Sequence, residues 1–343
     1  MTENIKNRLE YLDIAKGILI ILVVLGHSPY ANRYVIYWFH MPAFFIISGL
    51  LYKKGRPVSL FQNIKSLFIP YVSFSLINIA SILWVSPIYN GLEGFKILVE
   101  KHLYSGKVLG GVFWFIPVFF LTKIIFSFLS NRLNNKYLGL TIAILYTIAH
   151  LLSIYFIPNN NHTRTPENMV FPWNIDVVPI ALSYYFIGFY IQRFTYIFHN
   201  CKNVLLFALF CVFFLIINKL YGLNYQFDMK YSFYKNLMLD MFVPFIFTIL
   251  ILFISRIISK VSKEVPKVLS KLGENSLFIM YLHIPVCSVL LANIRPEYTL
   301  YTLIGISVPM CFAILVQKNK YINFLFTGKI FSYENHQLES KTK

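Results

Sequence analysis

Long apolar runs recur along the whole chain, and short polar segments that hold most of the charges separate them. A run of roughly 20 apolar residues is long enough to cross the hydrocarbon core of a bilayer as a helix. Ten such runs are predicted, at residues 12–30, 35–52, 66–85, 109–129, 138–157, 177–197, 204–221, 237–257, 275–292 and 299–317. The pattern predicts an all-α, polytopic membrane helix bundle with about ten transmembrane helices, in which residues 1–343 form a single domain.

The composition supports a bilayer as the solvent. Hydrophobic residues make up 57% of the chain and charged residues only 13%, which is more apolar surface than a soluble domain of this size could bury. The net charge of +17 alone would also suit a nucleic-acid partner. The basic residues, however, fall in short clusters between apolar runs instead of forming one patch, so no nucleic-acid partner is expected.

The distribution of charge predicts the orientation. Ten spans place both termini on one side, and the loops on that side hold most of the Lys and Arg, including the cluster from Arg256 to Lys271. The positive-inside rule then predicts cytoplasmic termini in a cell membrane, with the longest outer loops at 86–107, 158–176 and 222–235. The four cysteines do not suggest a disulfide framework.

Ionisable side chains lie inside the first apolar run. Asp13 and Lys16 stand near its start and His27 near its end, and such groups are costly in a membrane span and are read as functional by default. A rise of about 1.5 Å per residue separates Lys16 from His27 by roughly 16 Å. A purely structural interpretation also exists: Asp13 caps the helix, Lys16 snorkels to the interface, and His27 lies among the headgroups.

His40 opens the second run at the membrane face where the first run ends. Histidines from two adjacent antiparallel helices can share one cavity, and a pair of imidazoles suits proton transfer. A metal would need a third ligand that the sequence does not supply, so no metal site is predicted. His283 stands alone on a late apolar run, where it is either functional or a hydrogen-bonded residue of the bundle.

Several motifs in order resemble one family. LDIAKGILIILVVLGH followed by FHMPAFFIISGLLY is similar to the opening of the integral-membrane type-3 acyltransferases, in its fucose-O-acetylase-like subgroup. The segments KSLFIPY from Lys65, WFIPVF from Trp114, ALSYYFIGFY from Ala181 and LGENSLFIMYLHIP from Leu272 resemble later motifs of that family. The chain has Lys16 where many members have Arg, and Gln62 where many have the first of two arginines.

The resemblance implies a membrane O-acyltransferase, most simply an O-acetyltransferase, with acetyl-CoA as the donor. The acceptor implied is a sugar hydroxyl of a bacterial surface polysaccharide or of its lipid-linked precursor. The predicted roles are catalytic for His27, His40 and Asp13, donor-binding for Lys16 and Lys65 with Lys53, Lys54 and Arg56, and acceptor-binding for Trp114, His283 and Trp173.

Two alternatives stay open from the sequence. An exporter of polysaccharide or lipid-linked sugar would also have about ten spans and ionisable groups along its path, although no internal repeat is visible. Trp173 and the polar residues before it either stack on a sugar or belong to an interfacial aromatic belt. Direct transfer and transfer through an acyl-histidine are both compatible with the residues, as are acetyl and other acyl groups.

Overall fold

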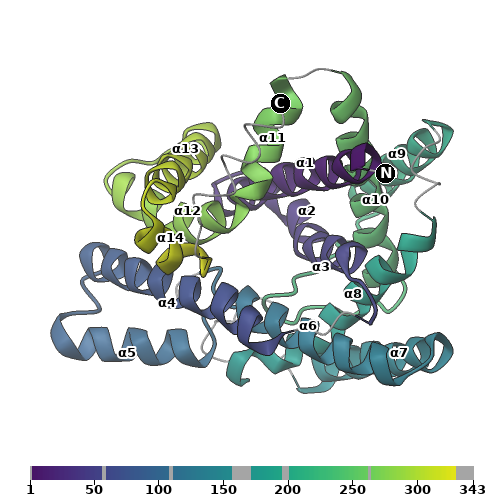
Figure 1. The fold of residues 1–343 in the computed structure, drawn as a ribbon, viewed down its shortest axis with the longest axis horizontal. Coiled ribbons are helices and arrows are strands. Elements are labelled where there is room, and N and C mark those ends of the chain that lie inside the picture. The colour runs from purple at the N-terminus through teal and green to yellow at the C-terminus, as the bar shows by residue number, and fades with distance from the viewer. Residues whose placement is uncertain are drawn as a thin grey trace.

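The computed structural model describes residues 2–55, 59–107, 111–156, 171–194, 201–261 and 264–329. Helices dominate these residues, and the one extended pairing reported among them is an isolated bridge between Asp228 and Phe233. The elements are α1 (Thr2–His27), α2 (Arg33–Tyr37), α3 (His40–Leu51), α4 (Leu60–Val85), α5 (Gly91–Tyr104), α6 (Phe115–Arg132), α7 (Asn135–Leu151), the π-helix η2 (Leu152–Phe156), the 3₁₀ helix η4 (Pro172–Val177), α8 (Val178–Ile191), α9 (Cys201–Leu220), α10 (Leu239–Val261), α11 (Glu264–Glu274), α12 (Ser276–Leu290), α13 (Tyr298–Gln317) and α14 (Lys320–Thr327) (Figure 1).

The fold class predicted from the apolar runs is confirmed. Each of the ten runs falls on a helix or on two consecutive helices. Within the described residues, seven helical segments are long and apolar enough to cross a membrane, and Val204–Leu220 and Ser276–Leu290 are shorter apolar helices. α1 is not among the seven, because its last 18 residues contain Glu10, Asp13 and Lys16. The protein is a multi-pass membrane helix bundle.

The helices α3 and α8 cross in backbone contact. A Cβ atom on Gly49 of α3 would lie 2.0 Å from the carbonyl oxygen of Tyr185, and one on Gly188 of α8 would lie 2.0 Å from that of Ile46. Small residues let membrane helices approach this closely, which maximises van der Waals contact where no hydrophobic force drives association. The crossing fixes the helix that begins with His40.

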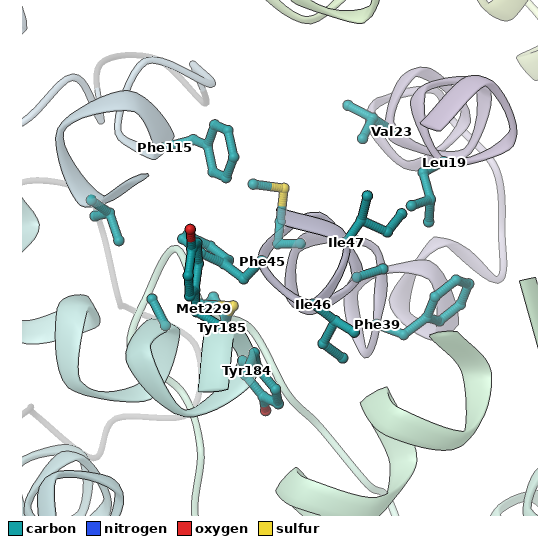
Figure 2. Packing of buried hydrophobic residues seen from close by; sticks show 14 of the residues in the cluster. Leu19, Val23, Phe39, Phe45, Ile46, Ile47, Phe115, Tyr184, Tyr185 and Met229 are labelled. Carbon is teal, nitrogen blue, oxygen red and sulfur yellow. The ribbon is translucent and has the colours of Figure 1, made fainter. Parts of the chain in front are cut away.

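The core lies between α1, α3, α6 and α8. Figure 2 shows Leu19 and Val23 of α1, Phe45 and Ile47 of α3, and Phe115 of α6 in one cluster of buried side chains. His27 and His40 lie beside this core, where α1 ends and α3 begins.

One helix was not predicted. Residues 86–107 were expected to form an outer loop, but α5 lies antiparallel to the second half of α4 (Figure 1). Its buried residues are Gly94, Leu98 and His102, spaced by four, so one narrow stripe faces α4. Charged residues on the other face interrupt the apolar run, and a search for long apolar runs therefore misses this helix.

Candidate active site

A cavity of about 150 Å³ lies at the His27 end of α1. It is lined by Val23 and His27 of α1, Tyr37 of α2, His40 and Met41 of α3, Val112 and Trp114 just before α6, Met280 of α12, and the four residues Asp228, Met229, Lys230 and Tyr231. The structure therefore brings His27 and His40 to one cavity, as the antiparallel arrangement of their helices predicts. Trp114, predicted to bind the acceptor, lines the same cavity.

Hydrogen bonds fix the tautomer of the cavity histidines. Nδ1 of His27 lies 2.8 Å from the carbonyl oxygen of Val23, and Nδ1 of His40 lies 2.7 Å from that of Ile36. A carbonyl oxygen can only accept, so each Nδ1 carries the proton and donates it. In the neutral ring Nε2 then holds the lone pair, and Nε2 is the nitrogen that can accept a proton from a substrate.

His283 joins the same group. Its ring centroid lies 4.9 Å from that of His27, with the ring planes at 66°, and its Nδ1 lies 2.9 Å from the carbonyl oxygen of Ile279. Nε2 of His283 is buried and has no hydrogen-bond partner in the described part of the chain. A buried unpaired polar atom is costly, so a partner from outside the protein would be favourable here. Its predicted acceptor-binding role stays a prediction.

Two other buried histidines differ in this respect. Nε2 of His102 lies 2.9 Å from Nδ2 of Asn78, and Nε2 of His150 lies 3.1 Å from Oδ2 of Asp240. Both rings use both nitrogens within the protein, which is the pattern of residues that join helices. Within the described part of the chain, His27, His40 and His283 make hydrogen bonds only through Nδ1, and this distinguishes them from the two structural histidines.

A narrow hairpin, residues 228–233, closes one side of the cavity. Asp228 and Phe233 exchange backbone hydrogen bonds of 3.0 and 2.9 Å, and the carboxylate of Asp228 accepts the backbone N–H of Lys230 at 2.8 Å. The tip points into the protein: Met229, Lys230 and Ser232 are buried. Figure 2 shows Met229 in the same cluster as Phe45 and Tyr185.

Further bonds attach this hairpin to the bundle. The hydroxyl of Ser232 donates to the carboxylate of Asp176 in η4, and the hydroxyl of Ser153 in η2 donates to the carbonyl oxygen of Ser232 at 2.6 Å. These residues belong to the predicted outer loop 222–235. The structure shows that this part of the loop forms a docked wall of the cavity, with aromatic and methionine side chains buried together with polar ones.

Three charged groups of this region are perturbed by burial. Burial lowers the pKa of Lys230 to about 8, against the opposing effect of Asp228 and with a further decrease from Lys107. Burial also raises the pKa of Asp228, which the nearby Lys230 partly offsets. Burial lowers the pKa of Lys107, while Asp176 and Asp228 act to raise it. The sequence did not predict a functional role for any of these three residues. The available signal was the pair of opposite charges, Asp228 and Lys230, within an aromatic loop.

Asp13 and Lys16 lie far from the cavity. Oδ1 of Asp13 is 2.5 Å from Nζ of Lys16, and both side chains are about a quarter exposed. Asp13 does not cap a helix, because α1 begins at Thr2. The structure thus places this pair at the other end of the span from His27, and the catalytic role of Asp13 and the donor-binding role of Lys16 stay predictions.

Lys65 and Lys123 both lie near the N-terminal part of α4. The ammonium group of Lys65 is 5.4 Å from the ring centroid of Phe61 and 5.3 Å from that of Phe324 in α14. Nζ of Lys123 donates to Oδ1 of Asn63 at 2.6 Å, so this lysine has a partner on α4. Arg56, which was predicted to join the donor-binding group, lies outside the described residues.

Trp173 does not line the cavity. Its side chain is 39% exposed, and its ring centroid lies 5.5 Å from that of Phe68 in α4. The polar residues that precede Trp173 fall mostly within 157–170, and this segment lies outside the described residues. In the part of the chain that is described, no three His, Cys, Asp or Glu side chains gather as metal ligands would.

The cavity thus combines the imidazoles of His27 and His40, whose Nε2 atoms make no hydrogen bond within the described residues, with a buried ammonium group and aromatic walls. These are the groups that proton abstraction from a hydroxyl and stabilisation of an anion require. A family model described as an acyltransferase domain matches residues 9–318. Neither the curated proteins nor the solved structures gave a match. The match over nearly the whole chain, which agrees with the ordered motifs, means that this protein belongs to the acyltransferase 3 family.

Proposed function

We propose that this membrane acyltransferase moves an acetyl group from cytoplasmic acetyl-CoA to a sugar hydroxyl of a bacterial surface polysaccharide or of its lipid-linked precursor. The observation that carries the proposal is the unprotonated Nε2 of His27, which the bond from Nδ1 to Val23 holds beside the cavity. A fixed neutral imidazole in a low-dielectric site is suited to act as a general base toward a hydroxyl.

The reaction proceeds by direct transfer. Nε2 of His27 takes the proton of the acceptor hydroxyl while the hydroxyl oxygen attacks the thioester carbonyl carbon. The carbonyl oxygen becomes an oxyanion, and the tetrahedral intermediate collapses with cleavage of the carbon–sulfur bond. The CoA thiolate leaves and takes up the proton from the His27 imidazolium, which restores the neutral base. His40 and His283 lie around this centre as further neutral imidazoles.

The donor approaches from the opposite end of α1. CoA carries phosphates, and Lys16, Lys53, Lys54 and Lys65 supply cations that can bind them. The Lys16 side chain starts roughly 16 Å along the helix from His27, a distance that a thin pantetheine arm can cover. On the acceptor side, Trp114 offers an aromatic surface in the cavity on which a sugar ring can stack.

The orientation follows from the charge distribution. We expect both termini in the cytoplasm, so that the Lys16 end of α1 faces the cytoplasmic donor and His27 faces the outer half of the membrane. Tyr221 is 78% exposed and Lys267 is exposed. In a background without native cysteines, a cysteine replacing Tyr221 should react with an impermeant maleimide on intact cells. One replacing Lys267 should react only after the membrane is opened, and the reverse pattern would overturn the orientation.

The transfer itself is tested with purified protein in nanodiscs and acetyl-CoA labelled in the acetyl group. We expect release of free CoA and label on the glycan when the surface glycan is present, with NMR of the product locating the ester. Empty nanodiscs supply the control. CoA formation without glycan labelling would contradict the acceptor assigned here, and the absence of both would favour the alternative of a sugar exporter.

A further inference from the structure

General base catalysis explains only half of the proposed transfer. Attack on the thioester places a full negative charge on the carbonyl oxygen, and in a dry site that charge requires a preorganised donor or cation. The hydroxyl of Tyr37, which lines the cavity, already donates to the carbonyl oxygen of Gly26 at 2.6 Å. The cavity histidines likewise commit their Nδ1–H groups to backbone carbonyls. The stabilising group must therefore come from elsewhere in the lining.

Lys230 is the one lysine or arginine among the described residues that line the cavity. It is 9% exposed, and its charge lies near enough to act electrostatically on His27. Burying a charge is costly, and the nearby Asp228 offsets part of that cost for Lys230. A buried cation beside a proposed base is also a candidate functional group.

The hairpin holds Lys230 in place. The carboxylate of Asp228 accepts the backbone N–H of Lys230, and Ser232 and Met229 attach the tip on either side to η4 and to the core. A rigid support of this kind is what a preorganised site needs, because the cation then pays no reorganisation cost when charge develops.

We propose that Lys230 stabilises the oxyanion of the tetrahedral intermediate during acyl transfer, with the 228–233 hairpin holding it against the His27 cavity. This inference rests on the proposed function. As the acceptor oxygen attacks, the electron pair of the carbonyl bond moves to the carbonyl oxygen, which accepts a hydrogen bond from the Lys230 ammonium. When the carbon–sulfur bond breaks, that pair reforms the carbonyl, and Lys230 keeps its proton throughout.

The charge state supports this role. Burial lowers the pKa of Lys230 to about 8, with Asp228 opposing and Lys107 reinforcing the decrease. The side chain is then still mainly protonated at pH 7, and an ammonium group with a lowered pKa is a stronger hydrogen-bond donor than that of an exposed lysine. A hydrogen bond from such a group to a charged acceptor is strong in a low-dielectric site.

The test compares Lys230→Met with Lys230→Arg, and uses Lys235→Met as a matched control. Lys235 follows the same hairpin but does not line the cavity, and its ammonium lies 5.0 Å from the ring centroid of Phe233. Each variant is purified in nanodiscs and assayed for acetyl transfer at varied acetyl-CoA and varied glycan. Loss of one oxyanion donor predicts that Lys230→Met lowers kcat about 10²–10³-fold, with both KM values nearly unchanged. Lys230→Arg should retain most of the rate, and Lys235→Met should behave like the parent protein.

The outcomes separate the two proposals. If Lys230→Met raises the KM for glycan and leaves kcat intact, Lys230 binds the acceptor and the inference is wrong. Equal losses in Lys230→Met and Lys230→Arg would also overturn it, since a retained cation should retain the rate. Should the Met variant fail to accumulate, Lys230→Gln is judged by the same kcat criterion. A parent protein that transfers no acetyl group refutes the proposed function instead.

Discussion

Replacing His27 by Asn tests the centre of the proposed chemistry. Asn removes the only titratable group at that position and keeps a polar side chain of smaller size. Among the described residues, the His27 ring makes one hydrogen bond, from Nδ1 to the carbonyl oxygen of Val23, and its loss should cost about 1 kcal/mol of folding free energy. The bond from Tyr37 to the carbonyl oxygen of Gly26 still holds the end of α1. The variant should therefore insert and fold.

The effect on catalysis should be much larger than the effect on stability. A positioned general base contributes about 10²–10⁴ in rate, which corresponds to about 2.7–5.5 kcal/mol of transition-state free energy. In the direct transfer that we propose, the acceptor proton goes to Nε2 of His27, so the variant lacks the group that takes it. We expect kcat to fall by this factor, with the KM for acetyl-CoA nearly unchanged.

The assay is acetyl transfer to glycan in nanodiscs, normalised to folded protein by size-exclusion chromatography. His102→Asn supplies the matched control, since His102 is a buried histidine outside the cavity with both nitrogens bonded inside the protein. It should lower stability while leaving the rate per folded molecule close to that of the parent. A His27→Asn protein with more than a tenth of the parent rate would refute the assignment of His27 as the base.

Three further predictions concern the donor, the fold and the pH dependence. Lys16→Ala should raise the KM for acetyl-CoA more than the KM for glycan, and Lys16→Arg should keep both KM values close to those of the parent. If Lys16→Ala left the KM for acetyl-CoA unaltered, Lys16 would serve only to orient the protein in the membrane. Gly188→Ala should lower the free energy of unfolding by about 1–3 kcal/mol, because the added Cβ would lie 2.0 Å from a backbone oxygen. Gly139→Ala is the control and should leave the free energy of unfolding unchanged, because its Cβ would lie 3.6 Å from the nearest ring atom. Thermal unfolding in detergent measures the stability of the two variants. The transfer rate should fall as the pH rises through about 8, where Lys230 loses its proton, and the pH–rate profile of Lys230→Arg should lack that decrease.

The bundle could be predicted from the sequence because the bilayer imposes one length on every span. The run 12–30 or 299–317 needs no knowledge of its neighbours to be recognised as a helix. The helix α5 was not predicted because only one narrow stripe of residues around Leu98 packs it against α4. Such a stripe can be recognised as a packing face only when the partner helix is known. Its length and charge are those of a surface segment, so no local property of the chain marks it as packed.

The candidate site was predictable in part for a similar reason. His27 and His40 end and begin consecutive antiparallel helices, so the chain itself brings them together. His283 reaches His27 only through the packing of α12 on α1, a contact between distant parts of the chain that spacing cannot reveal. Lys230 was counted as an outer-loop charge, because a sequence shows the charge but not the hairpin that turns its tip inward.

The arrangement on α1 also constrains how the reaction can run. The helix holds the Asp13–Lys16 pair at one end and the His27 base at the other, and the Nδ1 bond to Val23 keeps the proton-accepting Nε2 available to the cavity. In the function that we propose, phosphates bound near Lys16 lie roughly 16 Å from the base. The proposed donor must then be extended, with its reactive carbonyl far from its charges. Acyl-CoA has that shape, whereas a compact acyl phosphate does not. The separation of the two polar groups along α1 is therefore compatible with the acyl-CoA donor that we propose, once Lys16 is taken as a residue that binds its phosphates.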